Sequence, residues 1–427
     1  MRRKGLLAAA AAAALALTGA ACGQDEETAA GGGDGAGGGE PKRTQGFDGT
    51  TIKLGVLTPL TGGVAVIGEP LTAGNEVYFE AVNKKGGIAG KYKVEIEQAD
   101  TQYEPDKTVQ QYNRLKNQVV AFTQVLGTAP TLALLPQLNR DKVLAAPASL
   151  DAFWVREPQL LPVGGPYQVQ AINALDYYVN KADGKGKKVC TFIQDDVYGE
   201  AGQQGVDFAA EKLGFTVTET QKFRVGTKDV AGQVQRLKRA GCEAVFLVAT
   251  PTDAGTIWGT AAQLKFAPRW MAQSPAWIDE LGKSPLAKYL EQTTWVIAEG
   301  TEWGDDSVPG MAEMVKNVQE LRPKQEPDYY FAFGYNQGRA MEAVLEKAVE
   351  MGDLSHEGIS KAAAALGTVS FEGLTDDYQY GAAEQRNPPR KSTIFEVDPK
   401  KAFGLGRLEY QYESEFAKEF EFQKAEL

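Results

Sequence analysis

Histidine, cysteine and basic residues are scarce in this sequence. Its 427 residues include one histidine, His356, and three cysteines, and 45 lysines and arginines stand against 56 aspartates and glutamates. A single histidine excludes His-rich metal sites and makes any Ser-His-Asp or Cys-His mechanism depend on that one residue. The net charge of −11 argues against a nucleic-acid partner, since nucleic-acid-binding proteins normally present a basic face. We therefore expect no metal, no cofactor and no nucleic acid, and we expect His356 in a surface loop.

A transmembrane segment is also missing. The apolar run from Leu6 to Leu17 is too short to cross a bilayer, and it follows the basic residues 2–4. Small residues and then Cys22 come next, a pattern that resembles a bacterial lipoprotein signal. Residues 1–21 are then a signal peptide, and acyl chains on Cys22 would anchor the protein to the cell membrane. Gly19 replaces the usual leucine, so ordinary cleavage to a soluble secreted protein is the alternative.

Residues 22–49 are expected to form a flexible tether. This segment is polar and rich in glycine, so it cannot bury enough apolar surface to fold. Gly33, Gly35 and Gly38 match the GxGxxG pattern, but no strand precedes them and no helix follows. A dinucleotide site is therefore not expected here.

Strand and helix patterns alternate after this tether. Ile52, Leu54 and Val56 alternate as in a strand, and the helix that follows ends at Gly86-Gly87. Alternation of this kind predicts a parallel sheet with right-handed crossovers. The expected strands of this first round lie at 52–56, 94–96, 119–126 and 143–146, and the expected helices at 69–84, from 105 onward and around 132–138.

A second round begins near Tyr167. The apolar strand 242–250 is continuous, as a buried parallel strand should be. Two open α/β sheets imply a crevice between them, and ligands of such sheets bind beyond the carboxyl ends of the strands. The further expected elements are helices around 172–179, 200–213, 230–237 and 257–264 and strands at 189–194, 215–218 and 269–272. The loops expected to contact a ligand are then 58–68, 127–131, 148–151, 195–199, 250–253 and 273–279.

Several motifs in this order resemble those of branched-chain amino acid binding proteins of ABC transporters. They are PLTG at 59–62, NKKGGIAG at 83–90, DDVYGEAG at 195–202, FEGLTD at 371–376 and IFEVDP at 394–399. The resemblance implies the α/β type I periplasmic-binding-protein fold, with two doubly wound parallel-sheet lobes joined by crossover hinge segments. The expected lobes comprise residues 50–165 and 299–378 (lobe 1) and residues 166–298 and 379–427 (lobe 2).

The resemblance also implies ligand-binding residues. In that family a hydroxyl and backbone N–H groups at a helix start hold the ligand carboxylate, and the matching positions here are Thr128, Ala148 and Ser149. The tyrosine that closes the second lobe matches Tyr198. The alternatives are that Thr128 only caps a helix and that Tyr198 only packs at the rim of its lobe.

The positions that would hold an amino acid's ammonium differ from the family pattern. The matching residues are Thr250 and Ser274, and neither supplies the negative charge that a desolvated ammonium requires. Ile67 stands where the family has an aromatic residue. We therefore expect a carboxylate, an amide or an aromatic acid rather than leucine, isoleucine or valine. Gln273, Trp277 and Trp154 are candidates for a different pocket wall, and Asp253, Asp279 or Glu280 could replace the missing carboxylate.

Two cysteines remain for the folded part of the chain. Cys190 opens one strand of the second lobe and Cys242 opens another, and these strands are neighbours in the family's topology. A Cys190–Cys242 disulfide is therefore expected in an exported protein, with two buried thiols as the alternative.

The function implied is solute binding without catalysis. A ligand would dock on the first lobe, the lobes would close, and a monomeric binding protein would engage an ABC permease and its ATPase. A ligand-sensing receptor module of the same fold is the alternative. A hydrolase is not expected, because the sequence has neither G-x-S-x-G nor HExxH.

Overall fold

The structure, a computed structural model, describes residues 39–425. The predicted signal peptide, Cys22 and most of the tether lie outside the described residues. In the part of the chain that is described, no helix has both the length and the apolar composition of a membrane span.

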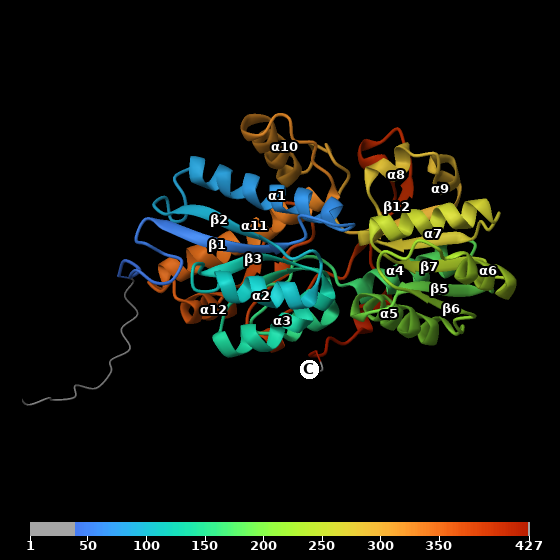
Figure 1. Cartoon of the computed structure of the whole chain (residues 1–427), viewed down its shortest axis with the longest axis horizontal. Coiled ribbons are helices and arrows are strands. Elements are labelled where there is room, and N and C mark those ends of the chain that lie inside the picture. Colours follow the sequence, from blue (N-terminus) through green and yellow to red (C-terminus); the bar gives the residue numbers. More distant parts are fainter. Residues whose placement is uncertain (1–38, 426–427) are drawn as a thin grey trace, which may run out of the picture. The chain divides into compact units, whose positions relative to one another are not determined.

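The first sheet is parallel and has the strand order β2-β1-β3-β4. Figure 1 shows α1 on one face of this sheet and α2 and α3 on the other. Glycine lets α11 approach α1 closely, because a Cβ on Gly74 would lie 2.0 Å from the carbonyl oxygen of Phe331. The strands are β1 (Thr51–Thr58), β2 (Lys93–Asp100), β3 (Ala121–Leu126) and β4 (Ala145–Ala148), and the helices are α1 (Ala65–Lys84), α2 (Pro105–Leu115), α3 (Thr128–Asp141) and α11 (Tyr329–Glu350).

The second sheet has the order β13-β12-β9-β8-β7-β5-β6. Its central strands are parallel, but β12 runs antiparallel to β9 and β13 antiparallel to β12. Figure 1 shows α7 and α5 on opposite faces of this sheet. The strands are β5 (Val189–Gln194), β6 (Thr220–Phe223), β7 (Ala244–Val248), β8 (Arg269–Gln273), β9 (Thr294–Ala298), β12 (Ser392–Val397) and β13 (Leu405–Tyr412), and the helices are α4 (Tyr167–Lys181), α5 (Val197–Leu213), α6 (Ala231–Ala240) and α7 (Pro251–Gln263).

Three connections join the two sheets, as the predicted fold requires. They run from β4 to α4, from β9 to α10 and from β11 to β12. The exact lobe boundaries, placed at residues 165, 298 and 378, stay predictions. The remaining elements are α8 (Asp279–Lys283), α9 (Ala287–Thr293), α10 (Pro309–Leu321), α12 (His356–Ala364), β10 (Thr368–Val369), β11 (Tyr378–Gln379) and α13 (Glu415–Glu419).

Two local predictions were wrong. The strand expected at 215–218 lies at Thr220–Phe223, where the chain runs in parallel register with residues 191–194 of β5. His356 is not in a surface loop but begins α12, with 8% of its surface exposed. Its Nε2 lies 2.9 Å from the carbonyl oxygen of Val119, because α12 covers the start of β3.

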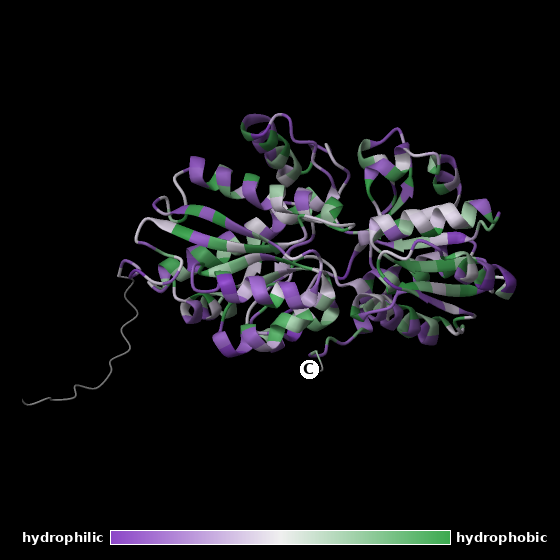
Figure 2. Cartoon of the chain, viewed as in Figure 1, coloured by the Kyte–Doolittle hydropathy of each residue, from purple (hydrophilic) through white to green (hydrophobic). Residues whose placement is uncertain are grey.

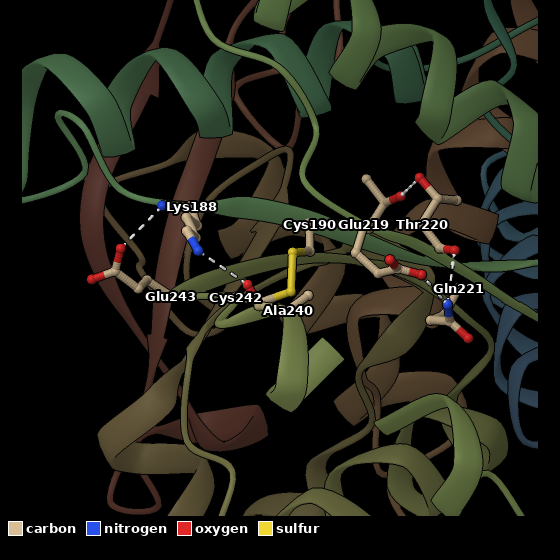
Figure 3. Close-up of a disulfide and its surroundings, with 9 residues drawn as sticks. Lys188, Cys190, Glu219, Thr220, Gln221, Ala240, Cys242 and Glu243 are labelled. Atoms are coloured by element: carbon tan, nitrogen blue, oxygen red, sulfur yellow. Dashed lines mark hydrogen bonds between the residues drawn. A yellow bond between two sulfur atoms is a disulfide. The ribbon is translucent and has the colours of Figure 1, made fainter. Parts of the chain in front are cut away.

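The hydrophobic residues follow the strands. Figure 2 shows green strands in both sheets and purple residues on the outer helix surfaces. Cys190 and Cys242 are joined by a disulfide with Cα atoms 5.8 Å apart, which is the pair that the sequence favoured. It ties the start of β5 to the turn before β7 (Figure 3). Beside it, the N–H of Lys188 donates to the Glu243 carboxylate at 3.1 Å.

Candidate functional site

A cavity lies where the carboxyl ends of strands from both sheets meet the start of α11. The space between atoms here is about 530 Å³, open solvent included, and we call it the tyrosine chamber. Its lining combines apolar side chains, small hydroxyl residues and five tyrosines. The lining residues are Val64, Ile67, Leu71, Tyr103, Leu126, Gly127, Thr128, Ala148, Ser149, Leu150, Tyr167, Tyr198, Thr250, Ser274, Pro275, Tyr329, Tyr330 and Phe333.

The start of α3 supplies hydrogen-bond donors to this chamber. Gly127 is the N-cap residue with φ 109°, and Thr128 is the first helical residue. The first N–H to bond within the helix is that of Thr131, which donates to Gly127 O at 3.0 Å. The N–H groups of Thr128 and Ala129 therefore precede the helical bonding pattern, as at other helix starts that hold anions. Thr128 is thus not the N-cap, and its side chain is free for another role.

Tyr103 reaches the chamber from a strained turn. Both Gln102 and Tyr103 have left-handed backbones, with φ of 53° and 65°. The Asp100 carboxylate holds this turn by accepting from the N–H of Gln102 at 2.9 Å. A Cβ on Gly127 would lie 2.6 Å from Cε2 of Tyr103, so only glycine lets this ring lie over the start of α3. Strain of this kind persists where the surrounding structure enforces it, often at binding sites.

The second sheet contributes the opposite wall. Tyr198, in the first turn of α5, packs against Tyr167 with ring centroids 5.1 Å apart. Thr250 precedes α7, and its hydroxyl donates to Asp253 at 3.1 Å. Ser274 directly follows β8. Both walls therefore come from loops at the carboxyl ends of parallel strands, where the sheet topology predicts a ligand.

The start of α11 closes the chamber. Tyr329, Tyr330 and Phe333 line it, and the Tyr330 hydroxyl donates to Trp277 O at 2.8 Å. Asp328 caps this helix by accepting from the N–H of Phe331 at 2.8 Å. Burial raises the pKa of the Asp328 carboxyl to about 7, so its charge is costly in this position.

The Thr128 hydroxyl at the chamber is buried without a hydrogen-bond partner among residues 39–425. The hydroxyls of Ser274 and Tyr329 lie within hydrogen-bonding reach of each other. A buried hydroxyl without a partner costs roughly 1–3 kcal/mol, so a ligand that pairs with Thr128 gains about that much. The chamber is therefore suited to a ligand with a polar end and an apolar body.

The chamber lining contains no charged residue in the described part of the chain. Asp253, a candidate for the missing carboxylate, lies outside the lining and already accepts from the N–H of Gly226 at 2.9 Å. Asp279 likewise pairs with Lys283. Asp151 lies just beyond the lining, accepts from Gln168 Nε2 at 3.1 Å, and burial raises its pKa to about 6. A bound ammonium would thus find no carboxylate in direct contact within the lining.

The structure brings seven of the nine predicted ligand-binding residues to one chamber. The other two, Gln273 and Trp277, are buried beside it but do not line it. The Trp277 indole N–H donates to Phe403 O at 2.7 Å. Trp154 is not a lining residue, but it holds one in place, because its indole N–H donates to the Ser149 hydroxyl at 3.0 Å. The seven lining residues are Ile67, Thr128, Ala148, Ser149, Tyr198, Thr250 and Ser274.

Sequence reasoning missed most of the aromatic lining. Tyr103 stands in a loop that follows β2, and this position was a signal that could have been used. Tyr329, Tyr330 and Phe333 come from a helix far along the chain, and nothing in their spacing separates them from ordinary core residues.

Comparison with known proteins places these observations in a family context. A family model described as "Periplasmic binding protein" matches residues 51–402. A "Leu/Ile/Val-binding protein homolog 3" of Brucella melitensis is 30% identical over 48% of this chain and 56% of that protein. An "Amino acid binding protein" of Pseudomonas aeruginosa is 27% identical over 54% of this chain and 62% of its own length. The chain thus aligns with little more than half the length of these two relatives.

Solved structures agree with the fold. A fatty acid ABC transporter substrate-binding protein from Thermomonospora curvata has a TM-score of 0.84 and 27% identity, covering 90% of this chain and 98% of that one. A branched-chain amino acid ABC transporter protein from Thermus thermophilus with bound valine has a TM-score of 0.73 at 17% identity, covering 87% and 98%. These likenesses confirm the predicted type I periplasmic-binding-protein fold.

Proposed function

This chain belongs to the periplasmic binding protein family, and we propose that it is the extracytoplasmic solute-binding lipoprotein of an ABC importer. Membership of this family makes it a binding protein rather than an enzyme. In this proposal Cys22 carries the lipid anchor and the protein acts as a monomer. The two lobes close over the solute, and the closed form engages a permease with its ATPase.

We further propose that the solute is a small carboxylic acid with an apolar body. The observation that carries this proposal is the chamber lining, which combines apolar residues and tyrosines with the unpaired Thr128 hydroxyl and no charged side chain among the described residues. The carboxylate would accept from the Thr128 hydroxyl and the N–H groups at the start of α3. The apolar body would lie among Tyr103, Tyr198 and Phe333.

The relatives' names point to two solute classes. The Brucella protein is named for leucine, isoleucine and valine, whereas the Thermomonospora protein is named for fatty acids. An amino acid brings an ammonium group, and leaving that group without a counter-charge in an apolar chamber is costly. The lining therefore favours an acid that lacks the amino group.

Isocaproate and leucine test this choice directly, because they differ only in the amino group. Isothermal titration calorimetry of the purified protein should show saturable binding of isocaproate and much weaker binding of leucine. Calorimetry with longer straight-chain acids would then show how long an apolar body the chamber accepts. Preferential binding of leucine would contradict the proposed ligand class, and conversion of any of these compounds would contradict a pure binding role.

A further inference from the structure

A second cavity adjoins the tyrosine chamber at the connections between the two sheets. The space between atoms here is about 590 Å³, open solvent included, and we call it the crossover chamber. Tyr329 and Phe333 line both cavities, so they form a common wall. The other lining residues are Glu299, Gly300, Thr301, Glu302, Trp303, Met311, Ala332, Asn336, Leu374, Thr375, Phe395, Ala402, Phe403 and Leu405.

Asn336 contributes a buried oxygen to this cavity. Within the described chain, no hydrogen bond reaches Oδ1 of Asn336. The hydroxyls of Thr375 and Thr301 lie within reach of the Glu299 and Asp305 carboxylates. The Asn336 oxygen can only accept, so this buried atom favours a ligand that donates a hydrogen bond to it.

The charge in the crossover chamber is negative. Glu299 is 8% exposed, and its Oε2 accepts from the N–H of Gly165 at 2.6 Å. Burial, with a smaller contribution from Asp376, raises the pKa of Glu299 to about 7. The other lining acid, Glu302, pairs with Lys401 at 3.4 Å. The described lining contains no lysine, arginine or histidine, so Glu299 has no counter-charge in the cavity.

The rest of the wall is apolar and aromatic. Trp303 and Phe403 pack with ring centroids 5.6 Å apart, and Met311, Leu374 and Phe395 complete the surface. Aromatic faces attract cations, and more strongly when water is excluded. An acidic group, an acceptor oxygen and aromatic rings therefore surround the same space.

We propose that the crossover chamber binds an organic ammonium ion with an apolar body, held between the Glu299 carboxylate and the Asn336 oxygen. The apolar body lies against Trp303 and Phe403. This ligand is distinct from the acid proposed for the tyrosine chamber, and the proposal does not depend on that acid. The two cavities share Tyr329 and Phe333 as a common wall.

Phenethylammonium and phenethyl alcohol test the proposal, because they share an apolar body and differ in charge. Calorimetry at about pH 8, where Glu299 is ionised, should show the ammonium binding at least about tenfold more tightly than the alcohol. Binding should persist when isocaproate is present in saturating amount. Equal affinity for the two probes, absence of binding at millimolar concentration, or complete displacement by isocaproate would overturn the proposal.

Two substitutions locate the ammonium. Glu299→Gln keeps the shape and an acceptor for Gly165 N–H but removes the charge, so it should weaken phenethylammonium binding about tenfold or more. Asn336→Ala removes an oxygen that has no partner among residues 39–425, so the affinity should fall although no protein hydrogen bond of that oxygen is lost. The matched control is Glu95→Gln, which makes the same change at an exposed position on β2. Unchanged affinity in both chamber variants would place the ammonium elsewhere.

Loss of isocaproate binding together with retained ammonium binding would refute only the acid of the tyrosine chamber. The reverse result would refute only the ammonium. The two proposals therefore fail separately.

Discussion

Thr128 is the residue on which the binding account depends most. Its hydroxyl is buried at the tyrosine chamber and unpaired within residues 39–425. We expect Thr128→Val to weaken isocaproate binding by roughly 1–3 kcal/mol, because a hydrogen bond to a charged group is lost. The free energy of unfolding without ligand should stay the same or rise slightly, since a buried orphan hydroxyl is removed. Calorimetry and urea unfolding measure the two effects.

Thr131→Val is the matched control for that experiment. Thr131 lies one turn further along α3, is buried, and is absent from the described chamber lining; its hydroxyl donates to Val125 O at 3.5 Å. Its substitution should leave isocaproate affinity unchanged. Equal affinities of the Thr128 variant and the unaltered protein would place the carboxylate elsewhere.

The buried carboxyl of Glu299 should make the free energy of unfolding depend on pH. Burial raises its folded-state pKa to about 7 from an ordinary value of 4.5. Between these two values the folded state holds a proton that the unfolded state has lost, so stability falls as pH rises, by up to about 1.4 kcal/mol per pH unit. Glu299→Gln should flatten this decline in urea unfolding between about pH 5 and pH 8. A decline of the same slope in the variant would contradict the assignment to Glu299.

Asp328 and Asp151 add to the same decline. Burial raises their pKa values to about 7 and about 6, so the Glu299 variant retains part of the pH dependence. Residues of this kind are hard to predict from sequence, because burial rather than a motif sets their pKa.

The hydroxyl residues of the site were predictable and the aromatic residues were not. Thr128, Ser149 and Ser274 each follow a strand closely, so the topology alone directs them to one edge. Tyr103 depends on a left-handed turn, and Phe333 depends on how α11 packs against α1. Neither depends on a local pattern that the sequence displays.

At the scale of elements, the disulfide is the clearest stabilising feature of the second sheet. It joins residues 52 positions apart, and closing a loop of this length stabilises a protein by about 2–4 kcal/mol. The double variant Cys190→Ala with Cys242→Ala should lose that much free energy of unfolding. A reductant should lower the melting temperature of the unaltered protein and not that of the variant. If the reductant has no effect on either protein, the disulfide contributes nothing measurable.

Most elements were predictable because strands and helices alternate with clear periods. The prediction of β6 was wrong because Phe215 and Val217 have a strand-like alternation, although they pack against the core before pairing with β5 begins. The antiparallel strands β12 and β13 were missed because they follow the third connection, where the βαβ alternation has ended. The period of the apolar residues identifies a helix or strand, while the neighbour with which a strand pairs depends on the fold of the whole chain.

At the scale of the whole molecule, Cys22 is predicted to carry the lipid anchor. In the bacterial cell, Cys22→Ser should move the protein from the membrane fraction to the soluble fraction, because this residue is the proposed site of the acyl chains. Mass spectrometry of the N-terminal peptide checks the modification. Membrane retention of the variant would contradict lipidation at this position.

Closure of the lobes is the second prediction at this scale. A solute that contacts both walls of the tyrosine chamber favours the closed form over the open one. Small-angle X-ray scattering should therefore show a smaller radius of gyration when isocaproate is added. No change at saturation would argue against closure on binding.

A crystal structure of the protein grown with isocaproate tests the central claim most directly. We predict a carboxylate oxygen within hydrogen-bonding distance of Thr128 Oγ1, and the apolar body among Tyr103, Tyr198 and Phe333. Isocaproate bound with its carboxylate away from the start of α3, or bound outside the tyrosine chamber, would contradict the account.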